Sequence, residues 1–337
     1  MQQAAQAVQE LDGSGLSLIE ISHRSAAFIE IMDKACSLAL ELLGLTDKGY
    51  KALFLQGGAS TQFLATAYNL LENKGVYLNT GTWSTKAIKE AKLLGEVVEV
   101  ASSADANFNY IPKEYSVPAD ADYLHITTNN TIFGTQIKAL PETDSVLVSD
   151  SSSDIFSRQL DFSKFGILYA GAQKNMGPAG TTLVVVKEHL LGKVTHKIPS
   201  MLDYALHGSK DSMFNTPPVF AVYTSMLTLD WLQKLGGIKA IEAKNNAKAD
   251  LMYGEIDRNP LFKGFAAVED RSTMNATFTL EQSTLKERFD TMCADALING
   301  INGHRSVGGY RASMYNALPI ESVQTLVDVM KELERTA

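Results

Sequence analysis

The sequence has 337 residues, of which 45% are hydrophobic and 20% charged, so the chain can bury a large core and reads as globular. Its formal net charge of −8 argues against nucleic acid and against an anionic membrane surface as partners. The two cysteines, Cys36 and Cys293, lie far apart without the spacing of metal ligands, so no metal site is expected.

No stretch of the sequence has the length and apolarity of a membrane span. The apolar runs are shorter than the roughly 18 residues needed to cross a bilayer. The first residues, Met1-Gln-Gln-Ala-Ala-Gln, have no signal segment. Together with two cysteines that look like buried thiols, these features predict a cytoplasmic protein.

The first half of the chain alternates helical with strand-like segments. A helix over residues 2–11 ends at Asp12-Gly-Ser-Gly15, an extended run covers 16–24, and a second helix covers 27–43. A strand, a glycine turn and a helix start follow over residues 51–62, and a further helix ends near residue 92. The remaining strands of this half are predicted over residues 75–79, 95–100, 122–127 and 146–150.

The second half predicts a change of architecture. Strands over residues 165–171 and 181–186 precede helices over 219–235 and 238–256. A strand over residues 272–280 and helices over 285–297 and 320–334 complete the chain. We therefore expect an α/β fold, with a large domain over residues 1–240 and a small C-terminal α+β domain over residues 241–337.

A single lysine follows an apolar strand in the stretch Phe165-Gly-Ile-Leu-Tyr-Ala-Gly-Ala-Gln-Lys174. Small residues precede the lysine and glycines follow it, so little side-chain bulk surrounds the amine. Such an amine can form a Schiff base with an aldehyde cofactor whose flat ring lies against bare backbone. Taken alone, a lysine at a strand end is more often a solvated charge.

A carboxylate lies directly after another buried-looking strand, in Val146-Leu-Val-Ser-Asp150. Pyridoxal phosphate requires both groups, because the lysine carries the aldehyde and an aspartate keeps the pyridine nitrogen protonated. Lys174 and Asp150 together therefore favour a pyridoxal-phosphate enzyme over a solvated lysine. His125, within an earlier strand, is expected to be a core histidine and not a base.

The turn Gln56-Gly-Gly-Ala-Ser60 joins a strand to a helix N-terminus. Free backbone N–H groups and the helix dipole favour an anion at such a turn. The cofactor phosphate fits there, with Ala59 and Ser60 as backbone donors. The alternative is a tight turn with Ser60 as the helix cap.

Three long stretches then identify a family. They are Tyr169-Ala-Gly-Ala-Gln-Lys174-Asn-Met-Gly-Pro-Ala-Gly180, Ser212-Met-Phe-Asn-Thr-Pro-Pro218 and Gly303-His-Arg-Ser-Val-Gly-Gly-Tyr-Arg-Ala-Ser313. In this order and spacing the chain closely resembles the phosphoserine aminotransferase family of class V aminotransferases. The resemblance implies a fold-type I transferase with a mainly parallel seven-stranded sheet and pyridoxal 5'-phosphate as cofactor.

The resemblance also implies roles for residues around the cofactor. Trp83 stacks on the ring, Thr131 contacts the ring hydroxyl, and Gln173 binds the cofactor beside the lysine. Asn215 and Thr216 reach the cofactor phosphate of the neighbouring subunit, so the active sites are shared within a homodimer. Many members have arginine at the position of Ser60. The resemblance therefore supports a role for the Ser60 backbone N–H in phosphate binding but none for its side chain.

Substrate recognition is implied for a second group of residues. Arg311 binds the substrate α-carboxylate, and Arg24, His304 and Arg305 hold the distal phosphate or carboxylate. In the family a short segment precedes the first helix and contributes to the substrate entrance, so the resemblance predicts a segment upstream of Met1.

The implied reaction is a ping-pong transfer of the amino group of L-glutamate to 3-phosphohydroxypyruvate, which gives O-phospho-L-serine and 2-oxoglutarate. Whether a related phosphorylated keto acid of pyridoxine biosynthesis is also used stays open. Two alternatives remain: another class V enzyme, such as an aminotransferase for small non-phosphorylated acids or a cysteine desulfurase, and an inactive cofactor-binding scaffold. A desulfurase requires an exposed loop cysteine, and neither cysteine is placed for that.

Overall fold

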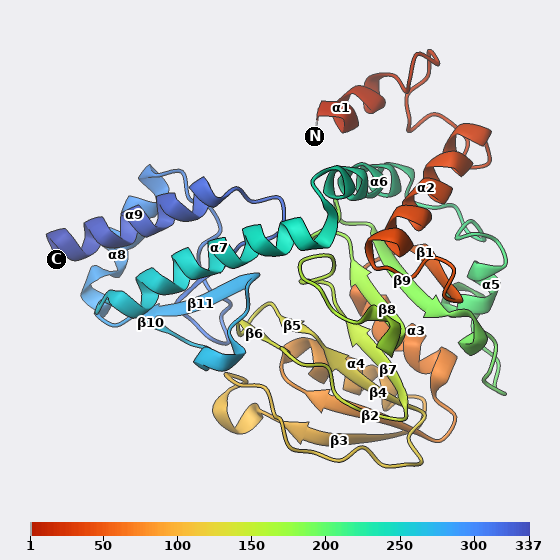
Figure 1. Cartoon of the computed structure of the whole chain (residues 1–337), viewed down its shortest axis with the longest axis horizontal. Helices are drawn as coiled ribbons and strands as arrows, with labels where there is room; N and C mark the ends of the chain where they lie inside the picture. Colours follow the sequence, from red (N-terminus) through yellow and green to blue (C-terminus); the bar gives the residue numbers. More distant parts are fainter. Residues whose placement is uncertain (1) are drawn as a thin grey trace.

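The computed structural model describes residues 2–337, and its main feature is a seven-stranded sheet (Figure 1). The strand order is β1-β9-β8-β7-β4-β2-β3. Only β9 runs against its neighbours, antiparallel to both β1 and β8, while the other pairs are parallel. The strands are β1 (Tyr50–Gln56), β2 (Lys74–Asn79), β3 (Glu96–Ser102), β4 (Tyr123–Thr127), β7 (Val146–Asp150), β8 (Phe165–Gly171) and β9 (Thr181–Lys187). The predicted mainly parallel seven-stranded sheet is thereby confirmed.

Helices cover both faces of this sheet because its central strands are apolar on both sides. On one face, α2 (Ala26–Leu42) and α6 (Val219–Lys234) pack with the strands into one core cluster. On the other face, α3 (Ala59–Leu70) and α4 (Thr82–Ala91) pack into a second cluster. The remaining helices of this half are α1 (Gln2–Gln9) and α5 (Tyr204–Gly208). Every residue of β8 is buried, as expected for a parallel-sheet strand covered on both faces.

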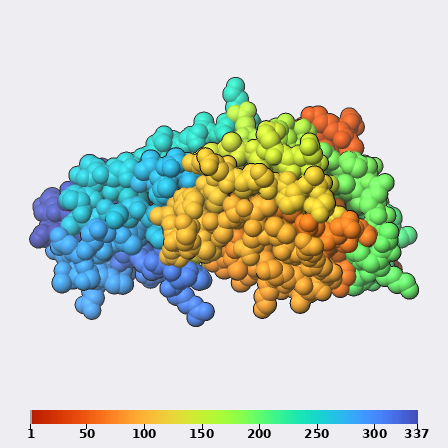
Figure 2. Space-filling model, turned by 90° about the horizontal axis from the view of Figure 1, so that it is seen from below, coloured from red at the N-terminus to blue at the C-terminus, as the bar shows by residue number. Residues whose placement is uncertain are grey.

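The C-terminal part forms a smaller unit around a three-stranded antiparallel sheet, β10 (Phe262–Gly264), β11 (Asn275–Leu280) and β12 (Tyr310–Ser313). It contains a third core cluster, to which α8 (Lys286–Asp295) and α9 (Ile320–Thr336) contribute. In the view from below it forms one end of the molecule, drawn in blue (Figure 2).

One long helix, α7 (Gly237–Arg258), joins the two units. Ile241 near its start packs into the cluster of the large sheet, and Met252 near its end packs into the C-terminal cluster. The domain boundary expected after residue 240 falls inside this helix and stays a prediction. A small two-stranded ribbon, β5 (Asn129–Asn130) and β6 (Thr135–Gln136), lies where the units meet.

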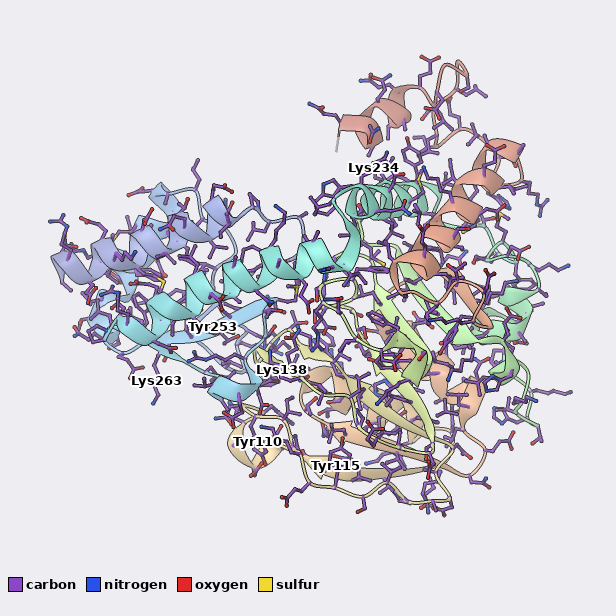
Figure 3. All side chains as sticks on the ribbon, viewed as in Figure 1. Tyr110, Tyr115, Lys138, Lys234, Tyr253 and Lys263 are labelled. Atoms are coloured by element: carbon purple, nitrogen blue, oxygen red, sulfur yellow. The ribbon has the colours of Figure 1, made fainter. Side chains whose placement is uncertain are left out.

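A side chain also crosses this junction. Lys138 of the large unit donates to the backbone carbonyl of Arg271, while Tyr253 on α7 donates to the Ser272 carbonyl at 3.0 Å within the C-terminal unit (Figure 3). The predicted strands and helices agree with the structure to within a few residues, but the extended run over residues 16–24 is wrong, since these residues form turns. Between residues 2 and 337, no helix has the length and apolarity needed to cross a membrane.

Candidate active site

The candidate site lies at the edge of the large sheet where the parallel strands end. Asp150 is the last residue of β7, and Lys174 lies in the loop that leads from β8 back into β9. Because β9 is antiparallel to β8, this loop stays at the same edge as the carboxyl ends of β4 and β7. Open α/β sheets bind ligands at this edge.

Lys174 is held by neighbours from separate segments. Its Nζ donates to Thr131 Oγ1 at 2.8 Å and lies 5.7 Å from the centroid of the Trp83 ring. Burial lowers the pKa of Lys174, and the positive charge of Arg311 lowers it further, while the carboxylate of Asp150 opposes both effects. An amine in these surroundings loses its proton more readily than an exposed lysine, as a nucleophilic amine requires.

Asp150 is 4% exposed, and burial raises the pKa of its carboxyl group. The charge of Lys174 and a hydrogen bond of 3.0 Å from the Ser152 N–H act in the opposite direction. Among residues 2–337, Ser152 is the one residue hydrogen-bonded to the Asp150 side chain, through its N–H and its hydroxyl. The carboxylate therefore has capacity to bind a further donor or cation. Its backbone is fixed by the Thr128 N–H, which donates to the Asp150 carbonyl at 3.0 Å.

The glycine turn before α3 adjoins the lysine loop, because the Gly57 N–H donates to the Gly180 carbonyl at 3.1 Å. Gly57 has a φ of +92°, which favours glycine. Gly58 is the N-cap and supplies no side-chain cap, so the first N–H groups of the helix, at Ala59 and Ser60, have no partner within it. The predicted cap by Ser60 is not formed, and the helix end remains open to an anion.

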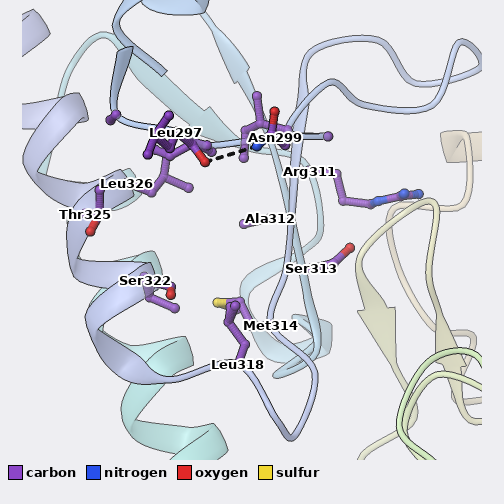
Figure 4. A pocket seen from close by; sticks show the side chains of 15 residues that line it. Leu297, Asn299, Arg311, Ala312, Ser313, Met314, Leu318, Ser322, Thr325 and Leu326 are labelled. Atoms are coloured by element: carbon purple, nitrogen blue, oxygen red, sulfur yellow. Dashed lines mark hydrogen bonds between the residues drawn. The ribbon is translucent and has the colours of Figure 1, made fainter. Parts of the chain in front are cut away.

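Two further side chains have a buried nitrogen without a hydrogen-bond partner in the described part of the chain. The Trp83 Nε1 and Arg311 Nε atoms are buried and have no hydrogen-bond partner among residues 2–337. Arg311 comes from β12 of the small sheet, and its Nη1 donates to the Thr131 carbonyl at 3.4 Å. Figure 4 shows Arg311 pointing away from a cavity of about 310 Å³ beneath α9 and toward the large unit.

The structure thus brings together Lys174, Asp150, Thr131, Trp83 and Arg311, with the α3 turn beside the lysine loop. Sequence reasoning did not single out Thr128 or Ser152, which hold Asp150. The serine run directly after a buried strand was a signal for the second of these residues.

The other predicted residues are exposed and have no hydrogen bond to Lys174, Asp150 or Arg311 within residues 2–337. The set comprises Arg24, Gln173, Asn215, Thr216, His304 and Arg305. His304 Nδ1 is hydrogen-bonded to Ser306 Oγ at 2.7 Å, and the Thr216 carbonyl accepts from Gln56.

The chain resembles known aminotransferases over nearly its whole length. The profile of the class-V aminotransferase family matches residues 1–326. The phosphoserine aminotransferase of Flavobacterium johnsoniae is 66% identical, over 99% of this chain and 94% of that protein. The solved phosphoserine aminotransferase from Bacillus circulans subsp. alkalophilus has a TM-score of 0.95 at 41% identity, with 99% and 95% of the two chains covered. The PLP-bound phosphoserine aminotransferase from Trichomonas vaginalis has a TM-score of 0.93 at 35% identity, with 98% and 95% covered.

Proposed function

Because the chain belongs to the phosphoserine aminotransferase family within the class-V aminotransferases, we propose that it transfers the amino group of L-glutamate to 3-phosphohydroxypyruvate. The products are O-phospho-L-serine and 2-oxoglutarate. The observation that carries this proposal is the half-buried Lys174 amine, whose pKa is lowered by burial and which lies near the Asp150 carboxylate, in a chain 66% identical to such an enzyme. The cofactor is pyridoxal 5'-phosphate, which the Trichomonas vaginalis relative binds.

The residues present fit this cofactor. The uncapped start of α3 supplies N–H donors for a phosphate, and the Asp150 carboxylate has capacity for a protonated ring nitrogen. Trp83 supplies a ring face for stacking, and its unpaired Nε1 lies in the same site. Thr131 Oγ1 accepts from the amine and is free to bond a ring hydroxyl as well.

When bound, the cofactor supplies an aldehyde for amino groups and a ring that accepts electrons. Lys174 Nζ removes and returns the proton at the substrate α-carbon, a task suited to an amine whose pKa burial has lowered. Asp150 keeps a negative charge opposite the ring nitrogen. Thr131 Oγ1 holds the amine of Lys174 in place before the cofactor binds.

Basic side chains recognise the anionic groups of the substrates. Arg311 binds the α-carboxylate, for which its guanidinium has unused donor capacity at Nε. Arg24, His304 and Arg305 bind the distal anion, so one cluster serves the carboxylate of glutamate and the phosphate of the second substrate.

The site is shared within a homodimer. Asn215 and Thr216 lie exposed between Phe214 and Phe220, which are 40% and 37% exposed, a surface of the kind that a second subunit covers. We place both residues on the cofactor phosphate of the neighbouring subunit, with Gln173 beside it. The enzyme is assigned to the cytoplasm.

Reduction with borohydride tests the assignment. We expect the reduced cofactor adduct on the peptide that contains Lys174, detected by mass spectrometry after digestion, and none in Lys174→Ala. An adduct on another peptide, or no adduct, overturns the proposal.

Substrate selectivity requires its own assay. Rates with 3-phosphohydroxypyruvate should far exceed those with pyruvate or glyoxylate, and comparable rates contradict a phosphate-selective site. The same assay with 3-hydroxy-2-oxo-4-phosphooxybutanoate tests a role in pyridoxine biosynthesis. The desulfurase alternative is disfavoured, since burial raises the pKa of Cys36 to about 12 and that of Cys293 to about 11.

Mixing variants tests the shared site. Lys174→Ala and Asn215→Ala damage different halves of one site if the two residues come from different subunits. We expect a mixture of the two variants, after subunit exchange, to regain activity that neither has alone. Activity that stays at the sum of the separate variants contradicts a shared site.

A further inference from the structure

The proposed site is assembled from three segments that are distant in the sequence. Lys174 lies in the loop after β8, Asp150 precedes the segment 151–157, and Arg311 lies on β12 in the C-terminal unit. The direct hydrogen bond that joins Arg311 to the large unit is long, 3.4 Å, and runs to the Thr131 carbonyl. Something else must therefore fix the distance between Arg311 and Lys174.

Asn175, the residue directly after Lys174, contacts both of the other segments. Its Nδ2 donates to the Ile155 carbonyl at 3.1 Å and to the Ser153 carbonyl at 3.4 Å. Its Oδ1 accepts from the Asn316 N–H at 3.0 Å. One buried amide thus ties the lysine loop to the segment after Asp150 and to the chain that leaves β12.

Asn316 continues the connection toward the C-terminal unit. Its Nδ2 donates to the Phe156 carbonyl at 3.1 Å, and its Oδ1 accepts from Asn245 Nδ2 on α7 at 2.9 Å. Phe156 is fully buried with a φ of +58°, an uncommon conformation for a bulky residue. The bond from Asn316 therefore holds a strained turn just downstream of Asp150.

The three asparagines are almost completely buried, with exposed fractions of 7%, 5% and 1% for Asn175, Asn316 and Asn245. Asn245 Nδ2 also donates to the Ser157 carbonyl at 2.9 Å. In the interior an amide that loses its partner is costly, so such a network accepts few alternative arrangements. A displacement of β12 relative to the lysine loop breaks several of these bonds together.

We propose that Asn175 and Asn316 are positioning residues that hold the Arg311 strand in register with Lys174. The inference rests on the proposed function, because it assigns Arg311 to the substrate carboxylate and Lys174 to the cofactor. It predicts that loss of either side chain impairs glutamate binding more than it impairs folding.

Asn69 provides a matched control. It is 4% exposed, its Nδ2 donates to the Ala65 and Leu202 carbonyls at 2.8 and 2.7 Å, and its Oδ1 accepts from the Tyr204 N–H at 3.0 Å. The bonding pattern equals that of Asn175, but Asn69 lies near the far end of α3 from the proposed phosphate site.

The experiment compares Asn175→Ala, Asn316→Ala and Asn69→Ala as holoenzymes. All three should lower the melting temperature. In the first two, we expect the KM for glutamate to rise about tenfold or more, which corresponds to the loss of about one buried hydrogen bond in positioning. Asn175→Ala should also shift the pH midpoint of the visible cofactor absorbance, because Lys174 is adjacent. Asn69→Ala should change neither quantity.

Two outcomes separate the inference from the proposed function. If glutamate does not change the visible absorbance of the wild-type holoenzyme, the proposed function fails. If the wild type responds and Asn175→Ala and Asn316→Ala match Asn69→Ala in KM and in the pH midpoint, the positioning inference alone is overturned. Should Asn175→Ala not fold, Asn316→Ala decides the question through the KM, since it keeps the backbone bond to Asn175.

Discussion

The Lys174 amine donates a hydrogen bond of 2.8 Å to the Thr131 hydroxyl. Thr131 follows the β5 strand of the small ribbon, and Lys174 follows β8, so the bond joins two loops at the same sheet edge. Because the partner is a neutral hydroxyl, it positions the amine without stabilising its charged form as a carboxylate in contact would.

Replacement of Thr131 by valine tests this contact. Valine has a similar volume but no hydroxyl, so the amine and the ring hydroxyl both lose a partner. We expect the dissociation constant of pyridoxal phosphate to rise about tenfold, or about 1.4 kcal/mol. Visible absorbance during titration of the apo-protein measures it. Thr131→Ser, which keeps the hydroxyl, should remain close to the wild type, and equal affinities for the two variants would count against the contact.

Asp150→Asn tests the proposed charge opposite the ring nitrogen. The amide oxygen can still accept from the Ser152 N–H, so the local structure is retained while the charge is lost. A carboxylate about 4 Å away stabilises a cation by about 4 kcal/mol at an effective dielectric of about 20. We therefore expect kcat to fall about a thousandfold. The melting temperature of the apo-protein should not fall, because burial disfavours the charged form. A kcat close to that of the wild type would refute the role.

His125 makes stability depend on pH. Its side chain is fully buried, its Nε2 is hydrogen-bonded to Tyr169 at 2.8 Å, and burial lowers its pKa to about 3. Between pH 3 and 6.5 the unfolded chain binds a proton at this residue that the folded chain does not bind. The free energy of unfolding therefore falls as the pH falls below 6.5, by about 1.4 kcal/mol per pH unit.

His125→Gln should remove this dependence while keeping a polar partner for Tyr169. Urea denaturation at pH 7.5 and 5.0 measures the difference. From pH 6.5 to 5.0 the wild type should lose about 2 kcal/mol more than the variant. Acidic residues contribute equally to both proteins, so parallel pH profiles would exclude His125 as the cause.

A buried ion pair lies behind the site. Arg158 Nη2 donates to Asp154 Oδ2 at 3.0 Å, and Thr128 Oγ1 donates to Asp154 Oδ1 at 2.5 Å. Arg158→Met leaves the carboxylate buried without its cation, so we expect a loss of about 3–5 kcal/mol in urea denaturation. Lys164→Met, which breaks an exposed pair with Glu142, is the control and should have no measurable effect. Similar losses of unfolding free energy in both variants would contradict a stabilising role for the buried Arg158–Asp154 pair.

The large sheet was predictable because its signals are local. The apolar run of β8 and the glycine turn before α3 are written in consecutive residues, and the structure has both. His125 was also predicted as a core histidine, and this is confirmed. A strand that is apolar on every position can only be covered on both faces, whatever the rest of the chain does.

Other parts depend on contacts between distant segments. The strand β12 has four residues and pairs on one side with β11, so its pattern is too short to identify it. The arrival of Arg311 beside Thr131 and the bonds of Asn175 and Asn316 arise from tertiary packing between units. An asparagine in a sequence carries no periodic pattern that predicts its partners. The hydrogen bonds of these two side chains form only when three distant segments meet.

The antiparallel pairing of β9 with β8 limits the motion of the lysine loop between them. The lysine loop, residues 172–180, is closed at its base by the pairing of Gly171 with Thr182, in the interior of the sheet. The lysine loop can move away only if the central strands β8 and β9 separate. The exposed turn at 303–309 can move without the separation of any strand of the large sheet. We expect amide hydrogens of β8 and β9 to exchange with deuterium only on global unfolding and those of the turn within the first time points, so that the loop of Lys174 is kept rigid while the turn that carries His304 and Arg305 fluctuates.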